Sequence, residues 1–175
     1  ADGFRLAVQR ISLLEALAER TEIVVPATSL AELRRLLAHQ AEAVRITLAD
    51  SRRHVQFTVG RTELVTVALE GMFPNYHALI PASAHANVTV EAQEFAHCVR
   101  SAMTMNGNLS VIRLAPSQKP GGIGQLAVTS QAAEVGDSEG SIDAVMDGDP
   151  VRIAFNGKYL ADALDAMDGK VVLQA

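Results

Sequence analysis

The chain has 175 residues, of which 49% are hydrophobic, and it carries 15 basic and 20 acidic side chains. This composition supports a hydrophobic core and excludes intrinsic disorder, and no apolar run approaches the roughly 20 residues that a membrane-spanning helix needs. The net charge of −5 lies entirely in residues 82–175, which argues against a strongly basic DNA-binding domain. The single cysteine, Cys98, excludes a disulfide framework and fits a cytoplasmic protein.

A weak internal repeat organises the chain. A run rich in β-branched residues leads into a helical pattern three times, and the helix starts at Ser29, Glu91 and Asn156 lie roughly 60 residues apart. This period predicts a repeated β-α-β-β-β unit. The strand-then-helix pairs are residues 22–26 with 29–40, 87–90 with 91–105, and 151–155 with 156–167.

The first predicted helix has a capping-box pattern, in which Ser29 caps the helix start and Glu32 reaches back to it. Each of the three helices has one apolar stripe at helical spacing, so each is expected to pack on a flat surface. Alternating strands supply that surface, and antiparallel meanders with helices on one face predict an α+β fold. The predicted strands that follow the first two helices are residues 44–48, 55–59, 64–69, 109–114, 126–130 and 141–146.

The sequence offers little catalytic chemistry. The five histidines are scattered and Cys98 has no second cysteine, so we expect neither a metal site nor a cofactor. The glycines of residues 121–124 lack the spacing of a phosphate-binding loop and are typical of a hairpin. Asp162, Asp165 and Asp168 are typical of a solvated acidic face, and Cys98 of a buried structural thiol.

The helix faces opposite the apolar stripes carry modestly basic or mixed charge. From spacing alone, ordinary solvated surface is the favoured interpretation. The residues on these faces are Arg35 and His39 in the first helix, His97 and Arg100 in the second, and Lys158 with Asp162 in the third.

Four segments, in this order, resemble a known family. They are DGFRLA at residues 2–7, EGMFPNY at 70–76, IP at 80–81 and IAFNGKYL at 153–160. Together they make the chain similar to the bacterial sliding clamp family, the β subunit of DNA polymerase III. The resemblance covers essentially the whole chain, and each segment by itself is only moderately specific.

The resemblance implies a DNA clamp fold and a processivity factor rather than an enzyme. Clamp subunits of this family close as a homodimer into a ring around duplex DNA, with helices lining the hole. Residues 1–76 would form the C-terminal half of the middle domain, and residues 77–175 the C-terminal domain without its last strands. The chain would then be part of a longer clamp. With helices lining the hole, the residues found on the faces opposite the apolar stripes would face the DNA, namely Arg35, His39, His97, Arg100 and Lys158. The family's subunit contact corresponds to Met103 and Thr104.

The family's partner site binds a short hydrophobic peptide, of the form Gln-Leu-x-Leu-Phe, from the polymerase and other clamp-binding proteins. Where the family often has histidine and a basic residue, this chain has Phe4 and Ala78, and no basic residue follows Pro26, which removes an expected DNA contact. Two alternatives stay open, a free-standing peptide-binding module without ring function and a small α+β enzyme. The positions matching the peptide site are Gly3, Phe4, Arg5 and Leu6 on one side, and Pro74, Ala78 and Leu79 on the other.

Overall fold

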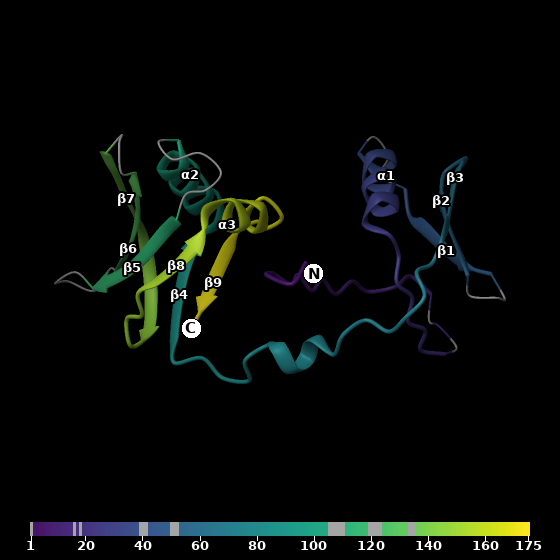
Figure 1. Ribbon diagram of the computed structural model, residues 1–175, viewed down its shortest axis with the longest axis horizontal. Helices are drawn as coiled ribbons and strands as arrows, with labels where there is room; N and C mark the ends of the chain where they lie inside the picture. Colours follow the sequence, from purple (N-terminus) through teal and green to yellow (C-terminus); the bar gives the residue numbers. More distant parts are fainter. Residues whose placement is uncertain are drawn as a thin grey trace. The chain divides into compact units, whose positions relative to one another are not determined.

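The computed structural model describes residues 2–15, 17, 19–38, 42–49, 53–104, 111–118, 124–132 and 136–175. The backbone divides into two units, which Figure 1 colours along the sequence. Unit 2 comprises Arg10–Leu79, and unit 1 comprises Ile80–Ala175 together with Ala1–Gln9.

Unit 2 contains helix α1 (Ala27–Leu37) and a three-stranded antiparallel sheet of order β1-β2-β3. The strands are β1 (Val44–Leu48), β2 (His54–Val59) and β3 (Thr62–Val67), followed by the short 3-10 helix η1 (Tyr76–Leu79). A turn at Gly60 joins β2 to β3, and the φ of 58° at this residue is a left-handed conformation that glycine adopts at little cost. Alternation in β2 buries Val55, Phe57 and Val59 on one face, as the sequence pattern predicts.

The predicted capping box at the start of α1 is wrong. The helix begins at Ala27, directly after Pro26, and the N-cap makes no side-chain hydrogen bond. Ser29 therefore lies inside the first turn, where its hydroxyl bonds the Thr66 hydroxyl of β3 at 2.7 Å. Pro26 is the N-cap, and its carbonyl oxygen accepts hydrogen bonds from the N–H groups of Ser29 and Leu30 at 3.1 and 3.2 Å, so the first helical turn begins ahead of the serine.

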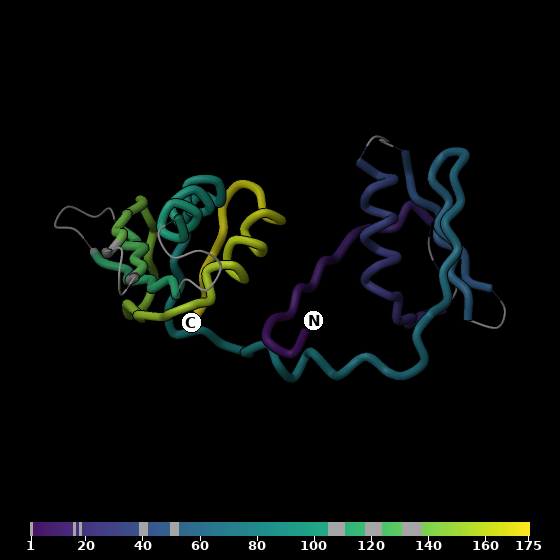
Figure 2. Tube along the Cα trace, turned by 45° about the horizontal axis from the view of Figure 1, so that its top comes forward, coloured from purple at the N-terminus to yellow at the C-terminus, as the bar shows by residue number. Residues whose placement is uncertain are grey.

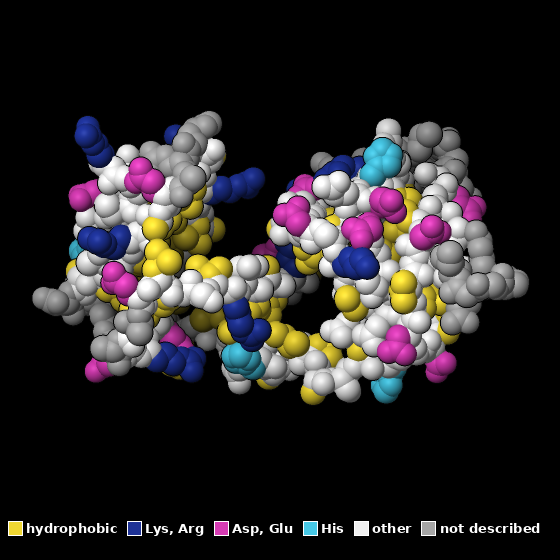
Figure 3. Space-filling view, turned by 180° about the vertical axis from the view of Figure 1, so that it is seen from behind, with side chains coloured by type: hydrophobic (Ala, Val, Ile, Leu, Met, Phe, Trp, Pro, Cys, Tyr) yellow, Lys and Arg dark blue, Asp and Glu magenta, His cyan; other side chains and the backbone are white. Residues whose placement is uncertain are grey.

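Helix α1 covers the sheet of unit 2 only in part. None of its residues is fully buried, and Leu30 at its start is 46% exposed. Ile46 of β1, which pairs with Phe57 on the same face, is 56% exposed. Exposed hydrophobic side chains of unit 2 form a continuous band in the unit at the left of Figure 3. The first repeat thus has an apolar face that its own elements leave partly uncovered.

Unit 1 is built on a six-stranded antiparallel sheet of order β8-β5-β6-β7-β4-β9. Its strands are β4 (Ala86–Glu91), β5 (Val111–Gln118), β6 (Gly124–Ala132), β7 (Gly136–Gly148), β8 (Ile153–Asn156) and β9 (Lys170–Gln174). The long strand β7 pairs with β6 along its first part and with β4 at its end, so it joins the two halves of the sheet.

Helices α2 (Ala92–Met103) and α3 (Gly157–Leu164) lie side by side on unit 1, as Figures 1 and 2 both show. They share one core with the sheet, in which Phe95 and Val99 of α2 are fully buried and Leu160 and Leu164 of α3 are nearly so. The buried hydroxyl of Ser130 in β6 donates to the carbonyl oxygen of Ala102 at 2.7 Å, which satisfies both groups.

The predicted starts of the second and third helices are confirmed, since Glu91 and Asn156 are their N-caps. The predicted strand at residues 22–26 is wrong, because only an isolated bridge joins Val24 to Leu69. The glycines of residues 121–123 lie outside the described residues, between the paired strands β5 and β6. No helix in the described part of the chain is both long and apolar enough to cross a membrane.

Candidate peptide and nucleic-acid interfaces

The first predicted wall of the peptide site lies on unit 1. Asp2 organises this segment, because one oxygen of its carboxylate accepts the backbone N–H groups of Phe4 and Arg5 at 3.1 and 3.0 Å. Its other oxygen accepts Nε of Arg5 at 2.9 Å. Gly3, within this turn, has a φ of 87°, which favours glycine. The turn therefore points the Arg5 guanidinium in a fixed direction.

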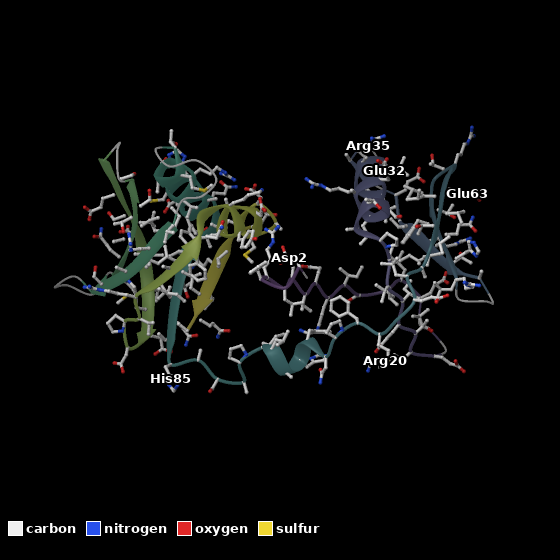
Figure 4. All side chains as sticks on the ribbon, viewed as in Figure 1. Asp2, Arg20, Glu32, Arg35, Glu63 and His85 are labelled. Atoms are coloured by element: carbon white, nitrogen blue, oxygen red, sulfur yellow. The ribbon has the colours of Figure 1, made fainter. Side chains whose placement is uncertain are left out.

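Arg5 connects this turn to helix α3. Its Nη1 donates to Oδ2 of Asp162 at 2.7 Å, and its guanidinium carbon lies 4.4 Å from the centre of the Tyr159 ring. The Phe4 ring lies 6.3 Å from the same tyrosine ring, although 83% of Phe4 is exposed, and Leu6 is half-buried. Figure 4 labels Asp2 beside α3. Phe4 and Tyr159 thus form an aromatic pair with a cation held against it.

The charges in this cluster support one another. Hydrogen bonding to Arg5 holds the pKa of the Asp2 carboxyl below its ordinary value, and Arg5 followed by Lys158 does the same for the pKa of Asp162. The two carboxylates in turn raise the pKa of Arg5. All three groups are therefore charged throughout the physiological pH range.

The second predicted wall of the peptide site belongs to unit 2. Pro74 precedes η1, and Ala78 and Leu79 end it, and all three are exposed, Leu79 by 70%. Within the same segment the rings of Tyr76 and His77 stack at 4.2 Å. The two walls come from different units, so their joining into one groove stays a prediction.

The predicted DNA-facing cations are exposed, and three of them are paired with carboxylates. Arg35 of α1 lies 3.4 Å from Glu32, and both are labelled in Figure 4. The other two pairs are Arg100 of α2 with Asp165, and Lys158 with Asp162 at 3.4 Å. His97 is exposed on α2, and His39 lies outside the described residues. These helix faces therefore carry cations whose charge is largely compensated within the protein.

The predicted subunit contact lies at the end of α2. Met103 is half-buried and packs against the core of unit 1, whereas Thr104 is exposed and its hydroxyl donates to the Arg100 carbonyl oxygen at 3.1 Å. Cys98 of the same helix is also partly buried, and this burial raises the pKa of its thiol, as a structural cysteine requires. The subunit contact itself stays a prediction.

An apolar hollow lies within the described part of unit 1, lined by residues of β4, β5, β6, β8 and β9. No acidic, basic, histidine, cysteine or tyrosine side chain lines it, so it lacks the convergent titratable groups that an active site needs. No cluster of potential metal-ligating side chains occurs among the described residues. The principal lining residues are Val88, Leu114, Leu126, Ile153, Phe155 and Leu173.

Sequence reasoning missed the connection between Arg5 and Asp162. The sequence predicts Arg5 as part of the peptide site and Asp162 as part of an acidic helix face. They lie 157 positions apart, so no local spacing could pair them. Only the spacing of Asp2 and Arg5, three residues apart, gives a local signal of the turn that aims the arginine.

Comparisons with known proteins agree with this fold. The crystal structure of the DNA polymerase sliding clamp from Bacillus subtilis matches with a TM-score of 0.74 and 26% sequence identity, covering 87% of this chain and 40% of that one. The fold is therefore the α+β DNA clamp fold, which confirms the predicted fold class.

Two family models divide the chain between them. The model described as DNA polymerase III beta subunit, central domain, matches residues 1–75, and the model of the C-terminal domain matches residues 77–173. The chain therefore belongs to the DNA polymerase III beta subunit family, as the resemblance predicts.

Curated relatives extend the agreement along the chain. The beta sliding clamp of Staphylococcus aureus is 30% identical over 174 residues, and that of Synechococcus elongatus is 31% identical over 169 residues. These alignments cover 98% and 95% of this chain, respectively, and 44% of each relative. The chain thus spans less than half the length of the curated relatives that it matches.

Proposed function

We propose that this chain is part of a sliding clamp, a non-catalytic processivity factor that encircles duplex DNA as a complete dimeric ring and tethers the replicative polymerase. The observation that carries the proposal is the succession of the family's central and C-terminal domains along residues 1–75 and 77–173. We assign residues 1–76 to the second half of the middle domain and residues 77–175 to the C-terminal domain. The expected location is the cytoplasm, where bacterial chromosomes are replicated.

The charge distribution suits a clamp that slides. A ring holds DNA topologically, so its contacts to phosphates need only be weak and independent of sequence. Paired cations such as Arg100 with Asp165 meet that requirement, because a compensated cation attracts phosphate less strongly than a free one. Net negative charge across residues 82–175 further limits nonspecific adhesion.

The partners would bind through a short hydrophobic peptide. The proposed site has Gly3, Phe4, Arg5 and Leu6 as one wall, with exposed apolar residues at the end of η1 as the other. Phe4 and Leu79 are large and exposed, which suits anchoring of leucine or phenylalanine side chains. The cluster around Arg5 supplies the polar groups that would orient such a peptide.

Fluorescence polarisation with a labelled Gln-Leu-x-Leu-Phe peptide tests this proposal. Saturable binding in the micromolar range is expected, and Leu79→Asp is expected to weaken it strongly. Val65→Asp is the matched control, since Val65 is an exposed apolar residue on the opposite face of the unit 2 sheet from Phe57. Absence of binding by the unmodified chain, or equal losses in the two variants, would contradict the assigned peptide site.

Retention on DNA separates a clamp from a peptide-binding module. The isolated chain is expected to bind linear duplex DNA weakly and to release it as the salt concentration rises. Tight, salt-resistant binding to linear DNA would contradict the dependence on a ring. Peptide binding by a full-length clamp containing this chain, without retention on circular DNA, would instead favour the module.

A further inference from the structure

The segment at residues 2–6 lies on helix α3 without the support of regular structure. Residues 2–9 form no helix or strand, so no backbone ladder holds them to unit 1. A segment that lacks such a ladder keeps one position only where particular side chains hold it. The contacts that connect this segment to α3 therefore decide whether it has one position.

Arg5 makes those contacts from three directions. Its Nε donates a hydrogen bond to Asp2 within the turn, and its Nη1 donates one to Asp162. The guanidinium carbon lies over the ring of Tyr159. An arginine can do this because its donors are fixed in a planar fork and its face stacks on aromatic rings. A lysine ammonium has neither property. Lys158 also approaches Asp162, but at 3.4 Å rather than 2.7 Å, so Arg5 is the closer partner.

We propose that Arg5 is a positioning residue that fastens residues 2–6 to helix α3 through Asp162 and Tyr159, and so fixes the Phe4 wall of the peptide site. The consequence for peptide binding rests on the proposed function, whereas the fastening itself does not. In the fastened state Phe4 and Tyr159 present one continuous aromatic surface. In the released state Phe4 is a mobile side chain, and a peptide would have to order it on binding.

Nuclear magnetic resonance measures the fastening directly. ¹⁵N relaxation of the Phe4 and Leu6 amides and the nuclear Overhauser effect between the Phe4 and Tyr159 rings are compared in Arg5→Gln, Asp162→Asn and the double variant. Each single variant is expected to mobilise the segment and abolish the ring contact, and the double variant to add nothing further. Arg45→Gln, an exposed arginine of β1, is the control. An ordered segment in Asp162→Asn, or additive effects in the double variant, would overturn the proposal.

Arg5→Lys separates charge from geometry. The lysine keeps the positive charge but loses the fork and the stacking, so the segment is expected to stay mobile. Full restoration of order by lysine would overturn the geometric part of the proposal.

The pH dependence provides a second check. The charged and titratable groups of the cluster are Asp2, Asp162, Lys158, Tyr159 and Arg5 itself. Both carboxyls have lowered pKa values, so their ion pairs with Arg5 stabilise the fastened segment fully above the ordinary carboxyl pKa of about 3.9. This stabilisation of the segment is lost as the pH falls through the lowered pKa values. Order of the segment is therefore expected to be constant from neutral pH down to about pH 5. A transition near neutral pH would contradict the carboxylate assignment.

Peptide affinity then tests the consequence for function. Asp162→Asn is expected to weaken binding of the Gln-Leu-x-Leu-Phe peptide several-fold, whereas Arg45→Gln is expected to leave it unchanged. If the segment is fastened but the unmodified chain binds no peptide, the proposed peptide site fails and the fastening stands. If Asp162→Asn releases the segment without a change in affinity, the positioning role is overturned.

Discussion

Replacing Gly148 by alanine is expected to weaken the pairing between strands β7 and β4. Gly148 ends β7, pairs with Ala86 and has a φ of 86°, a left-handed conformation that alanine rarely adopts. A Cβ at this position would lie 2.1 Å from the carbonyl oxygen of His85 and 3.2 Å from Cα of Ala86. Since these are backbone atoms, the first residues of β4 would have to move.

Two costs add in this variant. The left-handed conformation costs about 1–2 kcal/mol for a residue with a Cβ. The overlap with the backbone of β4 adds about 1–3 kcal/mol, the usual range for overpacking. Gly169, with a φ of 69° and no atom near its missing Cβ, would incur only the first cost. Gly148→Ala is therefore expected to lower the free energy of unfolding of unit 1 by about 2–5 kcal/mol, and Gly169→Ala by about 1–2 kcal/mol.

A urea titration followed by the amide signals of β4 and β7 measures the unfolding of unit 1 alone. The midpoint is expected to fall much further for Gly148→Ala than for Gly169→Ala, at unchanged slope. Equal losses in the two variants would refute the reasoning, because they would show that backbone conformation alone, without the overlap at His85, sets the cost.

Two further changes test the core and the charged helix faces. Phe95→Ala removes a fully buried ring from the core shared by α2, α3 and the sheet, and is expected to destabilise unit 1 by about 3–5 kcal/mol in the same titration; a loss below 1 kcal/mol would contradict the assigned core. Asp165→Asn removes the carboxylate partner of Arg100, so duplex DNA binding at low salt is expected to gain about one phosphate contact and a log–log salt slope steeper by about 0.9. Asp168→Asn, beyond the end of α3, is the control, and an equal change in both variants would indicate a general charge effect.

Strand and helix positions could be predicted where burial alternates strongly. The strand predicted at residues 55–59 lies within β2 (His54–Val59), because Val55, Phe57 and Val59 turn one face of that strand toward the core. The helix predicted from Ser29 starts earlier, because Pro26 sets the helix start and the serine hydroxyl bonds Thr66 instead. Local capping rules failed there because a tertiary partner competed for the same hydroxyl.

The candidate site could be predicted only in part. Its residues came from the resemblance, since Phe4 and Leu79 by spacing alone are ordinary apolar residues. The pairing of Arg5 with Asp162 depends on the fold, which brings together two segments 157 positions apart, and no local pattern encodes this contact. Helix periodicity does not predict the pairing of Arg100 with Asp165 either, because this ion pair forms only when α2 and α3 lie side by side.

The length of β7 has a consequence for how unit 1 unfolds. One uninterrupted strand pairs with β6 over Gly136–Ala144 and with β4 over Val145–Gly148. Neither half of the sheet can therefore separate without losing hydrogen bonds to the same strand. Unit 1 should therefore unfold in one cooperative transition, even though its sequence contains two repeats. A destabilising substitution at either end of β7 should lower protection from hydrogen exchange in both halves of the sheet.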